Sequence, residues 1–225
     1  MKYLIANWKQ NITSKDIPYW VELFSKSLNQ NIFDNLKIVV APSFPQLHLL
    51  NGLLIDNNLN LNKVSVSAQN VSPFQSGSHT GEVGVDQISD VCTYVIVGHS
   101  ESRAHCETYQ DINSEISLII NAGLIPIICF SSIEEFNAFD DQYKNNMDIL
   151  FAYEPTASIG TGLFASAEEL NQIRESTNLE DFIYGGSVDK TSISNYLKLS
   201  FITGFLVGGA SLDPIAFAKL ANIVV

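Results

Sequence analysis

The sequence predicts an α/β fold in which strands and helices alternate to form a single (β/α)8 barrel. Eight short apolar runs rich in Val and Ile recur along the 225 residues, with helical stretches between them. Successive residues within the runs are mostly apolar, as expected for parallel strands that protein covers on both faces. No linker divides the chain, so we expect residues 1–225 to form one domain. The predicted strands span residues 2–6, 37–41, 63–68, 93–97, 125–130, 148–153, 181–184 and 203–207.

A doubly wound open sheet is the alternative architecture, because it shows the same alternation of strands and helices. Barrels of this type typically have ~250 residues, so we expect trimmed connections here. The shortest lies between the fifth and sixth predicted strands, where residues 133–139 must serve as the whole crossover. Apolar residues with helical spacing occur in residues 18–24, 111–120 and 214–221.

Composition and charge exclude several classes of function. The net charge of −12 and the pI near 4.6, with scattered basic residues, argue against a nucleic-acid or anionic-membrane partner. No apolar run approaches the ~20 residues that a membrane span requires. Asn7 and Lys9 interrupt the N-terminal apolar run too early for a signal peptide. The cysteines Cys92, Cys106 and Cys129 are therefore expected to be free thiols in the cytoplasm.

The stretch from Ala152 to Gly162 places a carboxylate at the end of a predicted strand. Pro155 biases the preceding Glu154 toward an extended backbone. Gly160 and Gly162 add flexibility and exposed amides, so the stretch predicts a fixed base followed by a mobile lid that can meet an anion. A helix is expected to follow, with Ser166 as its N-cap and Glu169 completing a capping box. An ordinary strand–loop–helix connection with a solvated glutamate is the alternative.

Candidate site residues lie directly after the predicted strands, because the chemistry of such barrels sits at the carboxyl ends of the strands. The end of the barrel at which the strands terminate would then bring together an amide, a cation, an imidazole, a carboxylate and two glycine-rich turns. These residues are Asn7 and Lys9 after the first strand, His99, Ser100 and Glu101 after the fourth, Glu154 after the sixth, Gly185, Gly186 and Ser187 after the seventh, and Gly208, Gly209, Ala210 and Ser211 after the eighth.

The two glycine-rich turns follow neighbouring strands, the seventh and eighth, and together they predict a phosphate site. Loops at these positions bind phosphate through backbone N–H groups and a helix N-terminus. A single Gly-Gly pair would more simply serve a tight turn. Two such turns on adjacent strands favour the phosphate.

His99, Lys9 and Glu154 suggest the chemistry. His99 lies at the predicted first turn of a helix, which disfavours an imidazolium, so a neutral ring can donate to a substrate oxygen. Lys9 can stabilise negative charge on that oxygen, and Asn7 can donate to it. Capping and solvated roles are the alternatives for His99 and Lys9. With a carboxylate base the set predicts proton abstraction beside a carbonyl through an enediolate, with no cofactor and no histidine metal site.

Eight strings, in order over nearly the whole chain, resemble the triosephosphate isomerase family. The resemblance implies a TIM barrel that interconverts dihydroxyacetone phosphate and glyceraldehyde 3-phosphate in glycolysis and gluconeogenesis. The strings are Asn7-Trp8-Lys9, Ser67-Ala68-Gln69-Asn70, Thr80-Gly81-Glu82, Val97-Gly98-His99-Ser100-Glu101, Ala152-Tyr153-Glu154-Pro155, Ile159-Gly160-Thr161-Gly162, Tyr184-Gly185-Gly186-Ser187-Val188 and the run from Gly204 to Ser211.

The resemblance also implies roles for particular residues. Glu154 corresponds to the family's base and His99 to the donor that polarises the carbonyl. The family is typically a homodimer in which the loop after the third strand, here from Asn70 to Glu82, enters the partner's site. Lys9 and Asn7 resemble the oxyanion-side contacts, Ser100 and Glu101 their neighbours, and Gly160, Ser187, Gly208 and Gly209 the phosphate-binding amides.

Three positions depart from the family's pattern. Ala157 replaces the tryptophan of the lid's first hinge, Ser132 replaces a glutamate after the fifth strand, and Ser102 replaces the first arginine of a pair used at the subunit contact. We expect a working enzyme with altered lid kinetics and a weaker dimer.

Two rival functions are a barrel enzyme for a larger sugar or indole phosphate and a non-enzymatic scaffold. The lid glycines argue against the first, and retention of Lys9, His99 and Glu154 together argues against the second.

Overall fold

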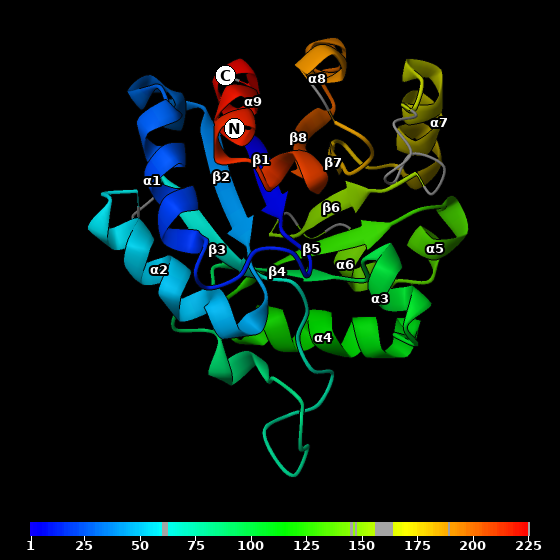
Figure 1. Cartoon of the computed structure of the whole chain (residues 1–225). Coiled ribbons are helices and arrows are strands. Elements are labelled where there is room, and N and C mark those ends of the chain that lie inside the picture. Colours follow the sequence, from blue (N-terminus) through cyan, green and yellow to red (C-terminus); the bar gives the residue numbers. More distant parts are fainter. Residues whose placement is uncertain (60–62, 145, 147, 156–163, 189, 225) are drawn as a thin grey trace.

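The polypeptide forms a closed barrel of eight parallel strands in the order β1 to β8, with β8 pairing to β1 (Figure 1). The predicted barrel is therefore confirmed over the doubly wound sheet. The computed structural model describes residues 1–59, 63–144, 146, 148–155, 164–188 and 190–224. The strands are β1 (Lys2–Asn7), β2 (Leu36–Ala41), β3 (Val64–Ala68), β4 (Tyr94–Val97), β5 (Ile125–Phe130), β6 (Leu150–Tyr153), β7 (Phe182–Tyr184) and β8 (Ile202–Val207).

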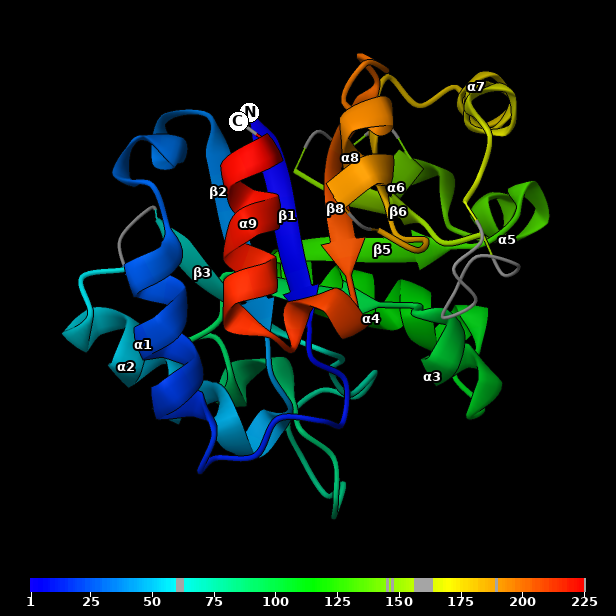
Figure 2. The ribbon, with the colours of Figure 1, turned by 45° about the horizontal axis from the view of Figure 1, so that its top comes forward.

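Helices surround the barrel, and Figure 2 shows α9 beside β1. None of the described helices has both the length and the apolar character that crossing a membrane requires. The α-helices are α1 (Ile17–Ser27), α2 (Leu47–Asp56), α3 (Ser100–Ala104), α4 (Tyr109–Asn121), α5 (Ile133–Asn137), α6 (Asp141–Lys144), α7 (Ala167–Thr177), α8 (Lys190–Tyr196) and α9 (Pro214–Val224), and the 3-10 helices are η1 (Gln30–Asp34), η2 (Phe44–Gln46), η3 (Val85–Gln87) and η4 (Gly209–Ser211).

Local sequence explains where these helices begin. The helix predicted over residues 111–120 lies within α4. The observed helix begins two residues earlier than predicted, because Thr108 and Asp111 form a capping box. Pro18 occupies the first turn of α1, where its missing N–H costs no hydrogen bond. Ser166 caps α7 as predicted, since its hydroxyl accepts from the backbone N–H of Glu169 at 3.1 Å.

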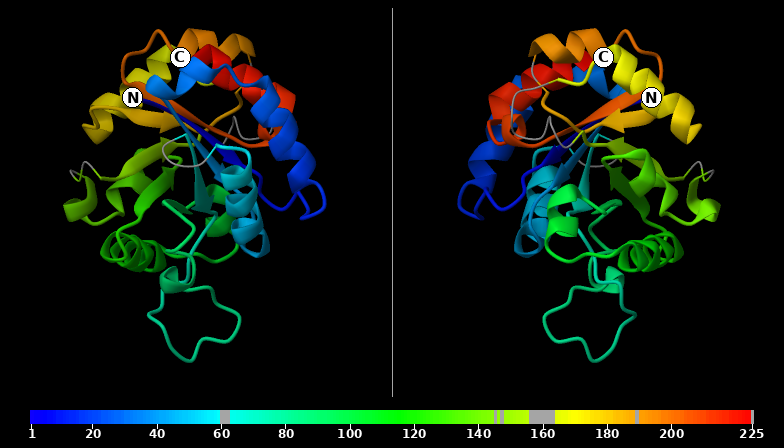
Figure 3. Two further views of the ribbon diagram at one scale, coloured as in Figure 1. Left: turned by 90° about the vertical axis from the view of Figure 1, so that its left-hand side faces the viewer. Right: turned by 90° about the vertical axis from the view of Figure 1, so that its right-hand side faces the viewer.

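Two expectations about the connections are wrong. Residues 133–139 are not the whole β5–β6 crossover, because α6 forms a second short helix after α5. Glu169 does not complete a capping box, because its carboxylate accepts the Tyr153 hydroxyl at 3.0 Å instead. The β3–β4 connection, expected to be a loop, carries η3 and a loop that projects away from the barrel (Figure 3).

The core forms two layers because the strands alternate their side chains. Leu4 and Ala6 of β1 face the helices, whereas Ile5 points into the barrel interior. Both faces are buried, which accounts for the continuous apolar runs of the sequence. The interior layer comprises Ile5, Val39, Ala41, Tyr94, Ile96, Ile127, Cys129, Ala152, Ile183 and Leu206.

Gly204 marks the tightest approach between β8 and β1. A Cβ at this position would lie 2.5 Å from the carbonyl oxygen of Tyr3, which is backbone and cannot move aside. We expect Gly204→Ala to lower the free energy of unfolding by about 1–3 kcal/mol, the usual cost of overpacking. Urea denaturation followed by circular dichroism measures the change.

Gly52→Ala is the matched control, since an added Cβ there on α2 meets nothing within 4 Å. Helix propensity predicts that it leaves stability unchanged or raises it by about 0.5–1 kcal/mol. Equal stability of the two variants would contradict the close approach of β1 and β8.

Candidate active site

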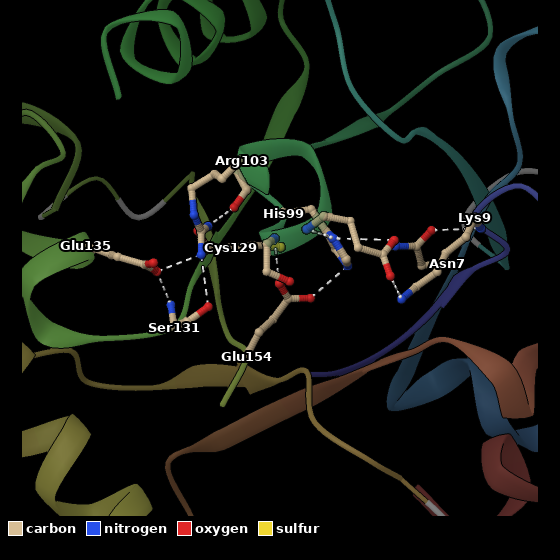
Figure 4. Close-up of polar contacts among 11 residues, drawn as sticks. Asn7, Lys9, His99, Arg103, Cys129, Ser131, Glu135 and Glu154 are labelled. Atoms are coloured by element: carbon tan, nitrogen blue, oxygen red, sulfur yellow. Dashed lines mark hydrogen bonds and ion pairs between the residues drawn. The ribbon is translucent and has the colours of Figure 1, made fainter. Parts of the chain in front are cut away.

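Most of the residues predicted at the strand ends line one cavity of about 360 Å³, whereas Ser100, Glu101 and Ser211 lie outside its lining. Lys9, His99 and Glu154, which are far apart in sequence, all line it, so the structure brings the three together. Figure 4 shows them in one continuous set of polar contacts. The lining comprises Asn7, Lys9, His99, Glu154, Phe164, Gly185, Gly186, Ser187, Val188, Leu206, Val207, Gly208, Gly209 and Ala210.

Glu154 is a buried carboxylate, 2% exposed, at the end of β6. One oxygen lies 3.0 Å from Nε2 of His99, and the other accepts the backbone N–H of Ser100 at 3.3 Å. A Cβ at Gly185 would lie 2.8 Å from Cγ of Glu154. Gly185 therefore leaves room for this side chain, a role that its assignment to a phosphate turn did not anticipate.

His99 is the N-cap of α3, as its predicted place at a helix start required. Its Nδ1 accepts the backbone N–H of Glu101 at 3.1 Å, so Nδ1 carries no proton. In a neutral ring the single N–H is then on Nε2, which lies 3.0 Å from an oxygen of Glu154. This hydrogen bond at Nδ1 therefore favours the neutral form of the ring.

Lys9 reaches the cavity from a strained backbone with φ of 52°, an uncommon value for a residue other than glycine. Its ammonium lies 2.5 Å from an oxygen of Glu101. Its N–H donates to Oδ1 of Asn7 at 3.1 Å, and its carbonyl accepts Nε2 of Gln69 at 3.0 Å. These bonds hold Lys9 in place, and they leave the side-chain nitrogen of Asn7 as a donor for a ligand.

The two glycine-rich turns border the same cavity. Ser187, Gly208 and Gly209 line it beside the catalytic candidates. The β8 turn is fixed because Ser211 donates to the Gly208 carbonyl from both its N–H, at 2.8 Å, and its hydroxyl, at 2.6 Å. Gly160 and the rest of the predicted lid, residues 156–163, lie outside the described residues.

The positions that depart from the family's pattern have local roles of their own. Ser132 caps α5, where its hydroxyl accepts the N–H of Glu135 at 3.2 Å. Ser102 lies on α3 and lines a second hollow of about 620 Å³ beside Lys9 and Glu101. Ala157 lies outside the described residues.

A pair of acidic side chains in this second hollow was not predicted from the sequence. Glu115 of α4 is only 1% exposed, and its Oε2 has no well-formed hydrogen bond within the described chain. Burial, reinforced by the charge of Glu107, raises the pKa of Glu115 to about 9. Burial also raises the pKa of Glu107. A lone glutamate in an apolar helix pattern gives no signal of this pairing, which depends on the α3–α4 turn.

This pair makes stability depend on pH. Folded Glu115 keeps its proton up to about pH 9, whereas in the unfolded chain it loses the proton near its ordinary pKa of about 4.3. The folded state therefore binds more protons between these values, and stability falls as pH rises through that window. We expect Glu115→Gln to flatten the fall and to stabilise the protein at pH 8 by about 1–3 kcal/mol.

Urea unfolding of the wild type and the variant at pH 5 and pH 8 measures this effect. Glu175→Gln, at an exposed position of α7, is the control and should leave the pH dependence unchanged. If stability changed equally between pH 5 and pH 8 in the wild type and in Glu115→Gln, this result would contradict a buried, protonated Glu115.

Comparison with known proteins gives one family. A family model described as triosephosphate isomerase matches residues 2–224. A triosephosphate isomerase of Mycoplasmopsis pulmonis is 38% identical over 240 residues, covering 96% of this chain and 95% of its own. Those of Mesomycoplasma hyorhinis, at 33% identity over 98% of this chain and 97% of its own, and Dehalococcoides mccartyi, at 32% over 97% and 94%, are also similar.

Proposed function

The chain belongs to the triosephosphate isomerase family and is an isomerase of that family, and from this premise we propose which of its residues interconvert dihydroxyacetone phosphate and glyceraldehyde 3-phosphate. The observation that carries the assignment is the convergence of Lys9, His99 and Glu154 on one cavity bordered by two glycine-rich turns. A carboxylate, a neutral donor and a cation around a small anchored anion suit proton transfer beside a carbonyl.

Glu154 is the proposed base. Its carboxylate takes a proton from the carbon next to the substrate carbonyl, the electron pair moves onto the carbonyl oxygen, and an enediolate forms. The same carboxyl then returns the proton to the neighbouring carbon. The proton of the original hydroxyl passes to the former carbonyl oxygen, so no atom is gained or lost. Burial at 2% exposure keeps competing water away from this carboxylate.

His99 and Lys9 are proposed to stabilise the charge that develops on the substrate oxygens. Nε2 of His99 lies 3.0 Å from Glu154, so when Glu154 moves to the substrate carbon, Nε2–H becomes available to a substrate oxygen. The Lys9 ammonium and the Asn7 side-chain amide supply further donors. Glu101 holds the Lys9 ammonium at 2.5 Å and gives its own N–H to His99.

The phosphate is proposed to bind at the turns after β7 and β8. Ser187, Gly208 and Gly209 border the cavity there, and Gly160 belongs to the same proposed set. Backbone N–H groups at these turns suit an anion without requiring a basic surface, which a chain with a net charge of −12 lacks. The proposed site uses no metal and no cofactor.

Turnover of glyceraldehyde 3-phosphate by the purified chain, measured in a coupled assay, tests this function. We expect efficient turnover of the triose and none of a larger sugar or indole phosphate. A preference for the larger substrates would favour the rival barrel enzyme, and a folded protein without turnover would favour a scaffold.

We further propose a cytoplasmic homodimer formed through the loop from Asn70 to Glu82. The loop projects from the barrel and leaves Phe74 48% exposed, stacked on His79 with ring centroids 4.5 Å apart (Figure 3). An exposed aromatic side chain on a projecting loop favours a protein partner. Because Ser102 offers no charge to such a partner, we expect a weak dimer. Sedimentation velocity over a range of concentrations tests it, and a monomer throughout would refute it.

A further inference from the structure

Arg103 of α3 contacts four acceptors at the carboxyl ends of β4 and β5. Its guanidinium donates to the Gly98 carbonyl, to the Cys129 carbonyl at 3.2 Å and to the Ser131 hydroxyl at 2.9 Å. The same group pairs with the Glu135 carboxylate at 2.7 Å. The side chain is only 11% exposed, so these bonds form away from bulk water, where they are strongest.

Glu135 holds the other side of this contact. Its carboxylate accepts the backbone N–H of Ser131 at 2.5 Å as well as the guanidinium. Its own N–H is bonded to the Ser132 cap, so both ends of the residue are fixed. Glu135 thus joins the start of the short helix α5 to α3 through Arg103 (Figure 4).

The acceptors of Arg103 include both peptide groups that flank His99. The guanidinium binds the carbonyl of Gly98, which precedes His99, and the backbone N–H of Arg103 donates to the carbonyl of His99 itself at 3.0 Å. Fixing these two peptide planes fixes φ and ψ of His99, observed at −58° and 140°. The backbone bond remains with any side chain at position 103, so the guanidinium contributes by fixing the Gly98 peptide from which the imidazole is directed toward Glu154.

We propose that Arg103, held by Glu135, is a positioning residue for His99 in the isomerase reaction. Arg103 does not line the substrate cavity, so its side chain acts through the Gly98 peptide that precedes the histidine. The inference rests on the proposed role of His99. It adds a residue pair outside the cavity that sets where Nε2–H points.

Arg103→Lys is the primary test, because lysine keeps the charge but lacks the planar fork that reaches several acceptors. We expect kcat to fall about 100-fold, as for a misplacement of about 1 Å, with KM changed by less than about threefold because the phosphate turns remain intact. Arg174→Lys is the matched control: this arginine bonds the Glu180 carbonyl at 3.3 Å on the far end of α7. It should behave as the wild type.

Two further variants separate positioning from folding. Glu135→Gln keeps an acceptor and removes the charge, so we expect a smaller fall in kcat at nearly unchanged melting temperature. Arg103→Ala should regain part of its kcat when millimolar guanidinium chloride is added, whereas Arg174→Ala should not respond. A melting temperature lowered in Arg103→Lys while kcat stays at the wild-type value would overturn the proposal.

Nitrogen-15 NMR of the histidine side chains tests the inference without substrate. In the wild type the Nε2–H signal of His99 should report the 3.0 Å contact with Glu154, and in Arg103→Lys this signal should shift or exchange faster. An unchanged signal would overturn the positioning role. A wild-type chain that turned over no triose phosphate would refute the proposed function, while the NMR shift would still report whether Arg103 orients His99.

Discussion

Replacement of Glu154 by glutamine is expected to lower kcat/KM for glyceraldehyde 3-phosphate by about 100- to 10,000-fold, the range that general base catalysis contributes. The glutamine side chain keeps the shape of glutamate and an oxygen that can accept the Ser100 N–H, but it cannot take a proton. Because the phosphate turns are untouched, KM should change little and the loss should appear in kcat. A coupled assay on purified, folded protein measures it.

Aspartate at the same position separates the presence of a base from its placement. Glu154→Asp retains a carboxylate but withdraws it by one methylene, so we expect a loss of about 100-fold. Glu168→Gln, at an exposed position in the first turn of α7, is the control and should leave turnover unchanged. Full activity of Glu154→Gln would remove the carboxylate from the mechanism altogether.

His99→Gln is expected to lower kcat by about 100- to 1000-fold, the loss typical of removing one donor from a developing oxyanion. The neutral imidazole is fixed by two partners, the N–H of Glu101 and the carboxylate of Glu154. A glutamine side chain cannot span both, so its amide is free to rotate away from the substrate oxygen.

The control for this variant is His48→Gln, which changes an exposed histidine on α2. Steady-state kinetics should give the wild-type kcat for His48→Gln and the full expected loss of kcat for His99→Gln. If His99→Gln kept wild-type kcat, then Nε2–H would not be the donor that the proposed mechanism requires.

The barrel and the cavity could be predicted because each depends on local sequence. Eight runs buried on both faces read as parallel strands, and the residues after them, such as Lys9 and Glu154, must meet at one end of a closed barrel. His99 was placed correctly at a helix start because Gly98 and Ser100 are local signals.

The remaining features depend on tertiary contacts that no local pattern encodes. Arg103 and Glu135 are 32 positions apart and meet only because β4 and β5 are neighbours. Glu169 has the spacing of a capping residue, yet the nearby Tyr153 hydroxyl competes successfully for its carboxylate. The pairing of Glu107 with Glu115 likewise arises from the turn between α3 and α4.

The contact between Glu154 and Nε2 of His99, 3.0 Å apart, has a consequence for selectivity. Each group is in contact with the other, so the base is held beside the group that must later serve the substrate. A ligand releases the carboxylate only if it brings an oxygen that can take over the imidazole N–H. We therefore expect an inorganic anion that binds only at the glycine turns, and does not contact His99, to occupy the cavity without releasing the base.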